Sequence, residues 1–401
     1  MKEKKAEKNQ VRVMILPEYG KQKLLTYADS FKDLAETFTQ FDSGEESACP
    51  AAPGSDRSEY LYQRKALENR EIMAEHLNEM AQIMTEVAKV SFAYIPLSDR
   101  KTRQIAHALK LEGIFLKEIH YIENKDGKLE IGAFLATEKG RTRTAEEAAN
   151  LFSVLFDKRL MVSGETDYYL DEKYRDFHFV EEPGYIVLTG TAKAVKENET
   201  VSGDSFCQFE IDKSTLVMML SDGMGSGEKA CADSLRVLDL MERMLSAGFS
   251  GETAVQMVNT SLSAGGMESN MSTLDVCSLD LYEGTMELTK VGAASTFLKR
   301  DNMVEQISSH NLPLGVFGKL EPEVITRKLS DGDYIIMVSD GVLEGLSQGI
   351  GEEVLSEVIS RISLENPKEI AGSLLNYVIR SCKGSIRDDM TVLVAGIWKN
   401  T

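Results

Sequence analysis

The chain has 401 residues, of which 42% are hydrophobic and 27% are charged, which is enough for a large core and for two or three domains. Its 64 acidic and 45 basic residues give a net charge of −19, and such a surface repels nucleic acid and anionic membranes. The five cysteines include no CxxC pair, which argues against disulfides and zinc and favours a cytoplasmic setting. The sequence contains no run of about 18 uncharged apolar residues, so we expect no membrane-spanning helix.

The first part of the chain is predicted to be helical. Apolar residues from Leu24 to Phe41, and again from Met73 to Val87, recur in steps of three and four, which favours helices with one apolar stripe each. A loop rich in small and acidic residues separates them. We expect a helical hairpin over about residues 20–92, either as a coiled-coil element or as two helices that pack on a neighbouring domain.

A small α/β part is predicted over about residues 100–170. Its pattern indicates a β-hairpin from 114–122 and 128–135, with Asp126-Gly127 at the turn, and a helix over 144–156. No catalytic signature falls in this part. We therefore expect residues 1–180 to form a region separate from the domain that follows.

Strands dominate from residue 181 onward. Strand hairpins alternate here with pairs of helices, not with the single crossover helices of a parallel sheet. The predicted fold of residues 181–401 is therefore α+β, an αββα sandwich of antiparallel sheets flanked by helices. The helices are expected at about 228–247, 253–263, 352–362 and 367–380.

Two short strings place an aspartate and a glycine at the end of an apolar strand. Ser221-Asp222-Gly223 follows the apolar run 216–220, and Ser339-Asp340-Gly341 follows the run 334–338. One such string alone is more often a simple turn, but the second copy makes that explanation much weaker. Carboxylates gathered at one place repel each other unless a cation lies between them, and hard divalent ions prefer oxygen ligands. The pattern indicates a metal-dependent hydrolase.

Further acidic residues extend this set. Asp388 and Asp389 open the last apolar run, and because side chains alternate along a strand only one of them can point into the site. Asp204 lies one hairpin before Asp222, so neighbouring strands can bring the two together, although a turn-capping role explains Asp204 equally well. The candidate metal ligands are Asp204, Asp222, Gly223, Asp340, Asp388 and Asp389, and the candidate catalytic residues are Asp222, Asp340 and Asp388.

Other catalytic signatures are missing from the sequence. There is no GxSxG elbow, no GxxxxGK[ST] loop and no HExxH pair. The string Gly223-Met224-Gly225-Ser226-Gly227 lacks the spacing of a dinucleotide-binding loop. A water activated between metal ions, attacking phosphorus in line, needs no protein nucleophile. His310 could border such a site.

The strings 202–206, 220–227, 312–315, 338–341 and 387–391 together resemble the metal-dependent serine/threonine protein phosphatases of the PP2C type. The chain is most similar to the cytoplasmic part of the stage II sporulation protein E family. The likeness covers about residues 183–398, and the stretch 24–41 looks like the helical segment that precedes the phosphatase domain in that family.

The resemblance implies two Mn²⁺ or Mg²⁺ ions bridged by Asp222, with the carbonyl of Gly223 as a further ligand. Asp340 and Asp388 would hold one ion, and Asp204 would support the other through waters. The implied substrate is a phosphorylated anti-anti-sigma factor, whose dephosphorylation activates a sporulation sigma factor.

The resemblance also implies that residues 1–180 are a regulatory region, whose front helices regulate the enzyme and form homo-oligomers. The residues to which we assign this role are Phe31, Phe38, Met80 and Met84, with Met224 and Gly225 passing control to the metals. A cell-division protein is a further expected partner. Because the family begins with a membrane portion that this chain does not contain, we expect a cytoplasmic protein or the cytoplasmic part of a membrane protein.

Two alternatives stay open. One is a stress-response phosphatase of the same fold with another anti-anti-sigma substrate. The other is a non-enzymatic scaffold for division or sporulation, which would be expected to have lost the acidic ligands that this chain retains.

Overall fold

The computed structural model describes residues 18–40, short helical pieces at 73–74, 77–78, 80–82 and 84–85, and residues 97–400 apart from 124–127, 164–166, 213, 226, 264–270, 309–310, 316–319, 321 and 347–349. The chain divides into two compact units, Met1–Asp29 with Glu79–Glu182 and Ser30–Asn78 with Pro183–Thr401. Within the described ranges, no helix is long and apolar enough to cross a membrane.

The first unit contains an antiparallel sheet in the order β1-β2-β6-β4, with two helices that share its core. Helix α4 begins at a capping box, in which the Thr144 hydroxyl accepts from the amide of Glu147 and the Glu147 carboxylate accepts from the amide of Thr144. The predicted hairpin and the helix over 144–156 are confirmed, and the turn at Asp126-Gly127 lies outside the described residues. The elements are α3 (Asp99–Leu111), β1 (Ile114–Glu123), β2 (Leu129–Thr137), β3 (Arg143–Thr144), α4 (Ala145–Phe156), β4 (Leu160–Val162), β5 (Tyr169–Leu170) and β6 (Arg175–Glu181).

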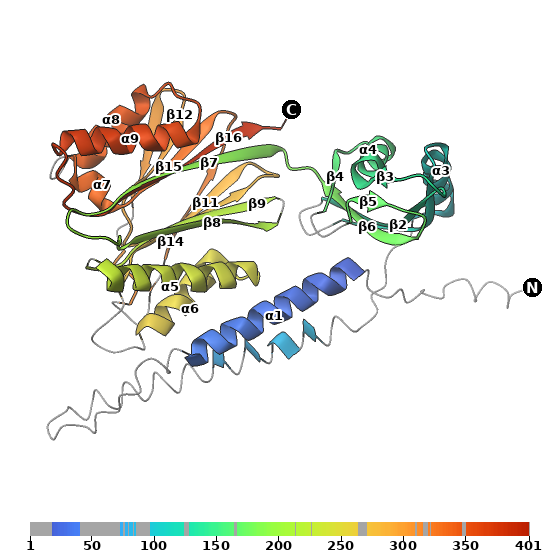
Figure 1. Ribbon diagram of the computed structural model, residues 1–401, viewed down its shortest axis with the longest axis horizontal. Helices are drawn as coiled ribbons and strands as arrows, with labels where there is room; N and C mark the ends of the chain where they lie inside the picture. Colours follow the sequence, from blue (N-terminus) through green and yellow to red (C-terminus); the bar gives the residue numbers. More distant parts are fainter. Residues whose placement is uncertain are drawn as a thin grey trace, which may run out of the picture. The chain divides into compact units, whose positions relative to one another are not determined.

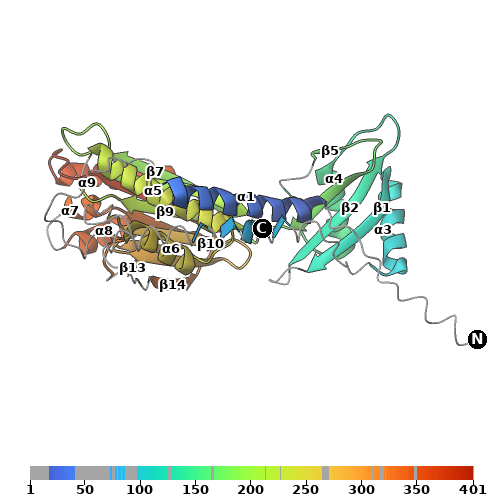
Figure 2. The ribbon, with the colours of Figure 1, turned by 90° about the horizontal axis from the view of Figure 1, so that it is seen from below.

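The second unit is a sandwich of two five-stranded antiparallel sheets (Figures 1 and 2). Helices α5 and α6 cover one sheet, and α8 and α9 cover the other, which confirms the predicted αββα fold. The first sheet, in the order β14-β11-β10-β9-β8, contains β8 (Asp204–Asp212), β9 (Thr215–Asp222), β10 (Leu274–Asp280), β11 (Thr285–Val291) and β14 (Glu323–Lys328). The second, in the order β13-β12-β15-β16-β7, contains β7 (Tyr185–Ala194), β12 (Thr296–Arg300), β13 (Met303–Ile307), β15 (Asp333–Val338) and β16 (Met390–Lys399). The helices are α5 (Gly227–Ser246), α6 (Gly251–Ser263), α7 (Asp340–Glu344), α8 (Gly351–Arg361) and α9 (Pro367–Ser381).

Alternation along the strands divides the core between the two faces of each sheet. Ile335 and Met337 point between the sheets and pack with Leu220 and Leu288, whereas Ile336 points toward the covering helices. Strand β15 is buried at every position. Both faces of this strand are therefore covered, which is why its sequence is an unbroken apolar run.

The layer between the sheets is apolar along most of its length but polar at one end. On each strand, every second residue points between the sheets. Toward one end of the sandwich these inward-facing residues change from apolar to charged or hydroxyl side chains. We call this set the polar end layer; it comprises Asp204, Asp222, Asp275, Lys290, Thr296, Ser339 and Thr391.

The front helix α1 (Glu18–Gln40) agrees with the predicted apolar stripe. Phe31 and Leu34 are buried. Within the second unit, the rings of Phe31 and Phe249 meet edge to face, with centroids 5.3 Å apart, and a carboxylate oxygen of Asp33 lies 3.8 Å from the guanidinium of Arg243. This part of α1 therefore packs beside the junction between α5 and α6.

The second predicted stripe is displaced around the helix axis. In the described pieces between residues 73 and 85, Ala74, Leu77 and Ala81 are buried, whereas Met80 is 45% exposed and Met84 is partly buried. Positions 74, 77 and 81 follow the spacing of three and four residues, so small alanines occupy the buried face where we had placed methionines.

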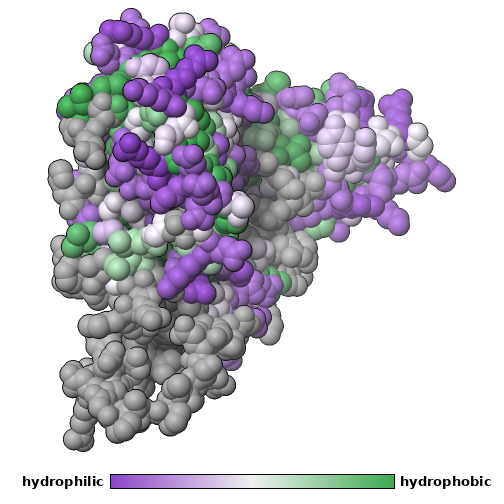
Figure 3. All heavy atoms as spheres, turned by 60° about the vertical axis from the view of Figure 1, so that its left-hand side comes forward, coloured by the Kyte–Doolittle hydropathy of each residue, from purple (hydrophilic) through white to green (hydrophobic). Residues whose placement is uncertain are grey.

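The surface at the end of the molecule that lies at the left in Figure 1 is mostly hydrophilic, with scattered apolar residues (Figure 3). Strand β14 contributes to the exposed edge of its sheet and alternates between partly buried and exposed positions. That strand was not predicted, because its sequence contains no apolar run.

Candidate metal centre

The hairpin of β8 and β9 brings two of the predicted ligands together. Asp204 and Asp222 are paired across the two strands, as the sequence predicted, and Asp204 is only 1% exposed. The next residue, Gly223, packs against α5, where a Cβ would lie 2.1 Å from the carbonyl oxygen of Ala230. The glycine is thus required by the close approach of the helix, and its place fixes the backbone directly after Asp222.

Asp340 comes from the opposite sheet, at the start of α7. It follows the buried strand β15, and Gly341 packs so closely on the loop before β16 that a Cβ would lie 2.1 Å from the carbonyl oxygen of Asp389. Asp222 and Asp340 share a hydrogen bond across the gap between the sheets. Carboxylates 118 positions apart in the chain are therefore neighbours in the fold.

The electrostatics of these carboxylates are strongly coupled. Burial, followed by the charges of Asp204 and Asp340, raises the pKa of Asp222 to about 9. Burial is also the largest cause that raises the pKa of Asp204 and of Asp340, and for Asp340 the charge of Asp388 adds to it. Asp340 retains more exposed surface than Asp204, so solvent weakens the effect of burial there.

The chemical nature of these oxygen ligands suits a divalent cation, but the distances between them are larger than in a formed metal site. Among the described residues, no three or more Asp, Glu, His or Cys side chains are close enough to enclose a metal ion. Charges affect each other's pKa over longer distances than a metal–ligand bond spans. The carboxylates can therefore raise each other's pKa without being close enough to enclose an ion. A divalent cation binds to carboxylate oxygens by displacing their protons. Because the set consists of hard oxygen donors, we consider it suitable for Mg²⁺ or Mn²⁺.

Asp388 and Asp389 occupy different environments. Both carboxylate oxygens of Asp389 accept from backbone amides, Oδ1 from Lys196 at 2.9 Å and Oδ2 from Gly203 at 2.7 Å. Asp388 has a side chain that is 39% exposed, lies 3.9 Å from the ammonium of Lys196, and contributes to the raised pKa of Asp222. The structure thus uses Asp389 to hold two loops, while Asp388 faces the carboxylate cluster.

Hydroxyl groups around the carboxylates were missed by the sequence analysis. Thr391 donates to Asp204 Oδ2 at 2.6 Å, and Ser339 also bonds to Asp204. Thr273 accepts at its hydroxyl from the amide of Asp222, at 3.1 Å, and Ser272 donates to the carbonyl of Asp222 at 2.7 Å. Thr391 and Ser339 belong to the sequence strings 387–391 and 338–341. Their inward-facing positions on the strands could have indicated that they contact the carboxylates.

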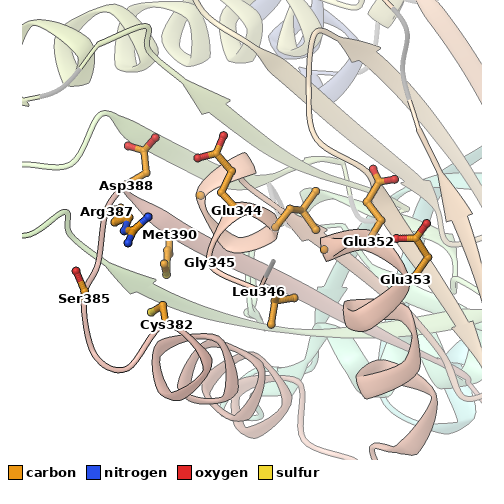
Figure 4. Close-up of a pocket in the computed structure, with 13 residues that line it drawn as sticks. Glu344, Gly345, Leu346, Glu352, Glu353, Cys382, Ser385, Arg387, Asp388 and Met390 are labelled. Atoms are coloured by element: carbon orange, nitrogen blue, oxygen red, sulfur yellow. The ribbon is translucent and has the colours of Figure 1, made fainter. Parts of the chain in front are cut away.

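A pocket of about 690 Å³ opens beside Asp388. Arg387 and Asp388 form one side of it, and Glu352 and Glu353 from α8 stand on the other (Figure 4). Of the described residues that line the pocket, Arg387 alone carries a positive charge, and it is exposed.

The remaining candidates lie near or outside this region. Met224 is 56% exposed, and Gly225 adopts a left-handed backbone with φ of 104°. The side chain of Phe38 and the whole of Ser226 and His310 lie outside the described residues.

Comparison with known proteins defines the class. Residues 212–398 match the family model described as Stage II sporulation protein E (SpoIIE). A solved structure of the PP2C phosphatase domain and a fragment of the regulatory domain of SpoIIE from Bacillus subtilis is similar with a TM-score of 0.62 and 29% identity, covering 86% of this chain and 96% of that one. The sandwich is therefore a PP2C-type phosphatase domain.

Two curated relatives extend the match toward the front of the chain. Stage II sporulation protein E from Priestia megaterium is 30% identical over 335 residues, and that from Bacillus subtilis (strain 168) is 29% identical over 339 residues. These alignments cover 83% and 84% of this chain but only 57% and 41% of the relatives. The phosphatase domain of this chain thus matches the stage II sporulation protein E family, and the chain spans about half the length of these relatives.

Proposed function

We propose that this chain is a Mn²⁺- or Mg²⁺-dependent protein serine phosphatase that dephosphorylates an anti-anti-sigma factor in the cytoplasm and so activates a sporulation sigma factor. The observation that carries the proposal is the coupling of Asp222 to Asp204 and Asp340 at the polar end layer of a PP2C-type domain. A raised carboxyl pKa that has both burial and specific charge partners as causes is typical of functional sites.

Each ligand receives a role from its place. Asp222, central in the coupled set, would be shared between two ions, with the Gly223 carbonyl beside it. Asp340 and Asp388 would hold one ion, and Asp204 would support the other. Two such ions supply an activated water and neutralise charge on the phosphoryl oxygens. We assign Asp389 to positioning, because its two oxygens already accept from Lys196 and Gly203.

The surrounding hydroxyls fix the orientation of the carboxylates. Thr391 holds Asp204, and Thr273 with Ser272 holds the backbone on both sides of Asp222. Residues whose rotamers are fixed in this way keep a ligand set in place before the ion binds. The pocket beside Asp388 supports a protein substrate, because Arg387 offers a planar cation suited to a phosphoryl group close to the proposed ions.

Phosphate release from a serine-phosphorylated anti-anti-sigma factor tests the proposal. We expect release with manganese and none with excess chelator, and a chain carrying Asp222→Asn serves as the matched control. A stress-response anti-anti-sigma phosphoprotein in a parallel assay distinguishes the sporulation substrate from that of the related pathway. A folded, manganese-loaded chain that releases phosphate from neither substrate would leave the scaffold alternative standing.

A further inference from the structure

An ion pair lies fully buried behind the proposed ligands. Lys290 on β11 is 0% exposed and Asp275 on β10 is 1% exposed, and the ammonium of Lys290 donates to Asp275 Oδ2. The hydroxyl of Thr296 donates to the same oxygen at 2.6 Å and accepts from Lys290 at 2.9 Å. Because Thr296 belongs to the other sheet, this triad joins the two sheets through the layer between them.

Such a pair is not explained by stability. Removing two charges from water costs more than their attraction commonly returns, and apolar residues of similar volume often serve equally well. Apolar residues do fill the neighbouring inward positions, Cys277 after Asp275 on β10 and Leu288 before Lys290 on β11. The change from apolar to charged therefore coincides with the approach to the metal centre.

One oxygen of the triad has no partner. No described residue donates a hydrogen bond to Asp275 Oδ1, although this atom is buried. Asp275 borders a cavity of about 20 Å³, which it shares with Asp222, Asp340, Thr273, Ser339 and Gly292. A water needs roughly 10–15 Å³ of such space and two to four polar partners, so the cavity suits one water molecule and no larger group.

Register explains why this cavity reaches the ligands. Asp275 is paired with Leu220 on β9, two residues before Asp222, so Asp275 and Asp222 lie diagonally on the same inward face. Asp340 closes the cavity from the other sheet. Asp275, with its unpartnered oxygen, thus lines the same cavity as both carboxylates.

We propose that this cavity holds one ordered water, which donates to Asp275 Oδ1 and to the Asp222–Asp340 pair, and that the Lys290–Asp275–Thr296 triad positions both ligands through it. The inference rests on the proposed metal centre and adds positioning residues to it. Partners of this kind commonly change metal affinity by about 10–100-fold. The triad holds its acceptor in place from both sheets, so it would also keep the two halves of the ligand set in register.

Manganese binding without substrate separates this role from a structural one. Replacing the triad together, with Asp275→Leu, Lys290→Met and Thr296→Val, leaves no unpaired buried charge, so we expect an unchanged or higher Tm in chelator. The manganese Kd from calorimetry is expected to rise by about tenfold or more. A lower Tm with an unchanged Kd would mean that the triad serves only the fold, and this result would overturn the inference.

Two further measurements keep the test decisive if the triple variant does not fold. Thr296→Val removes one hydroxyl and is expected to weaken manganese binding less than the triple change; an unchanged Kd contradicts the proposal. A crystal structure of the manganese-loaded chain should show a water at hydrogen-bond distance from Asp275 Oδ1, and an empty cavity contradicts it equally.

A second ion pair between strands of this domain, in which Asp333 is buried and Arg300 is 40% exposed, provides the control. Asp333 is buried at the opposite end of β15 and accepts from Arg300 on β12. Arg300→Met with Asp333→Asn should lower Tm and leave the manganese Kd unchanged. Wild-type protein that binds manganese but releases no phosphate would count against the proposed function, and the binding comparison would still decide the role of the triad.

Discussion

The apolar middle of the space between the sheets and its polar end layer follow opposite rules. In the middle, Leu288, Met337 and Leu393 exclude water, and the strands that carry them gain stability from burial. At the polar end layer, burial instead raises the pKa of Asp204, Asp222 and Asp340. The comparison teaches that one sandwich both gains stability from apolar burial and gathers carboxyl groups whose burial and mutual charge raise their pKa.

Among the substitutions that test this comparison, Asp222→Ala is expected to have the largest effect. Metal ions stabilise a phosphoryl transition state by several kcal/mol, and about 4 kcal/mol corresponds to roughly a thousandfold in rate. We expect phosphatase activity to fall at least that far, while Tm in chelator stays the same or rises because a buried carboxyl group crowded by Asp204 and Asp340 is gone. Full activity in the folded variant would contradict the assignment of the site.

At the apolar middle, Leu288→Ala should have the opposite profile. Leu288 is fully buried between the sheets, and deleting such a side chain commonly lowers the free energy of unfolding by about 2–5 kcal/mol. Urea unfolding measures the loss. At a temperature where the variant is folded, its manganese Kd should equal that of wild type. A higher Kd would show that the apolar middle and the polar end layer are not independent.

The adjacent aspartates allow the comparison within one dipeptide. Asp389→Asn replaces an oxygen that accepts from a buried amide, so we expect a loss of about 1–3 kcal/mol in unfolding free energy. Asp388→Asn should leave Tm in chelator nearly unchanged and weaken manganese binding. If Asp389→Asn weakened binding and Asp388→Asn did not, the roles proposed for the two residues would be reversed.

The front helix offers a milder test. Phe31 is buried against Phe249 beside the α5–α6 junction, so Phe31→Asp would place a charge in an apolar contact. We expect this change to alter oligomeric state or activation more than manganese affinity, measured by light scattering and by phosphate release. The exposed Thr26→Asp, on the same helix, is the control. Equal behaviour of both variants would argue against a regulatory role for Phe31.

The last expected effect concerns how stability depends on pH. The folded, metal-free chain holds a proton on Asp222, whose pKa is raised to about 9, whereas an unfolded aspartate titrates near about 3.9. This group's contribution to stability is therefore complete below about pH 4 and is lost as pH rises through about 9. Tm in chelator should decline across that window, and the gain in Tm on adding manganese should grow. A constant manganese gain would contradict proton competition at Asp222.

Much of this arrangement was predictable because the strands are simple to read. The apolar runs before Asp222 and Asp340 predicted both strands, and the hairpin predicted the pairing of Asp204 with Asp222. The choice between Asp388 and Asp389 was not predictable, since alternation shows that the two differ and not which backbone amides Asp389 would cap. Helix α3 was also missed, because only Ile105 and Leu109 on it are buried.

The buried triad was hidden for a different reason. Asp275 and Lys290 interrupt strand sequences that otherwise read as half-buried, and a sequence pattern assigns such residues to solvent. Their pairing depends on the register between β10 and β11, and their contact with Thr296 depends on how two sheets pack. Neither the strand register nor the packing of the two sheets can be predicted from the periodicity of one segment.

Strand β16 has a consequence for the order of events during synthesis. It pairs with β15 on one side and with β7 on the other, so a strand made late in translation enters the middle of a sheet whose flanking strands were made earlier. Asp388 precedes it directly and Thr391 lies within it. A chain whose residues 390–399 have not yet left the ribosome therefore lacks the strand that joins β15 to β7, and it lacks the Thr391 hydroxyl that donates to Asp204. Strand β16 must therefore be synthesised before the second sheet and the hydrogen bond that holds Asp204 can be complete.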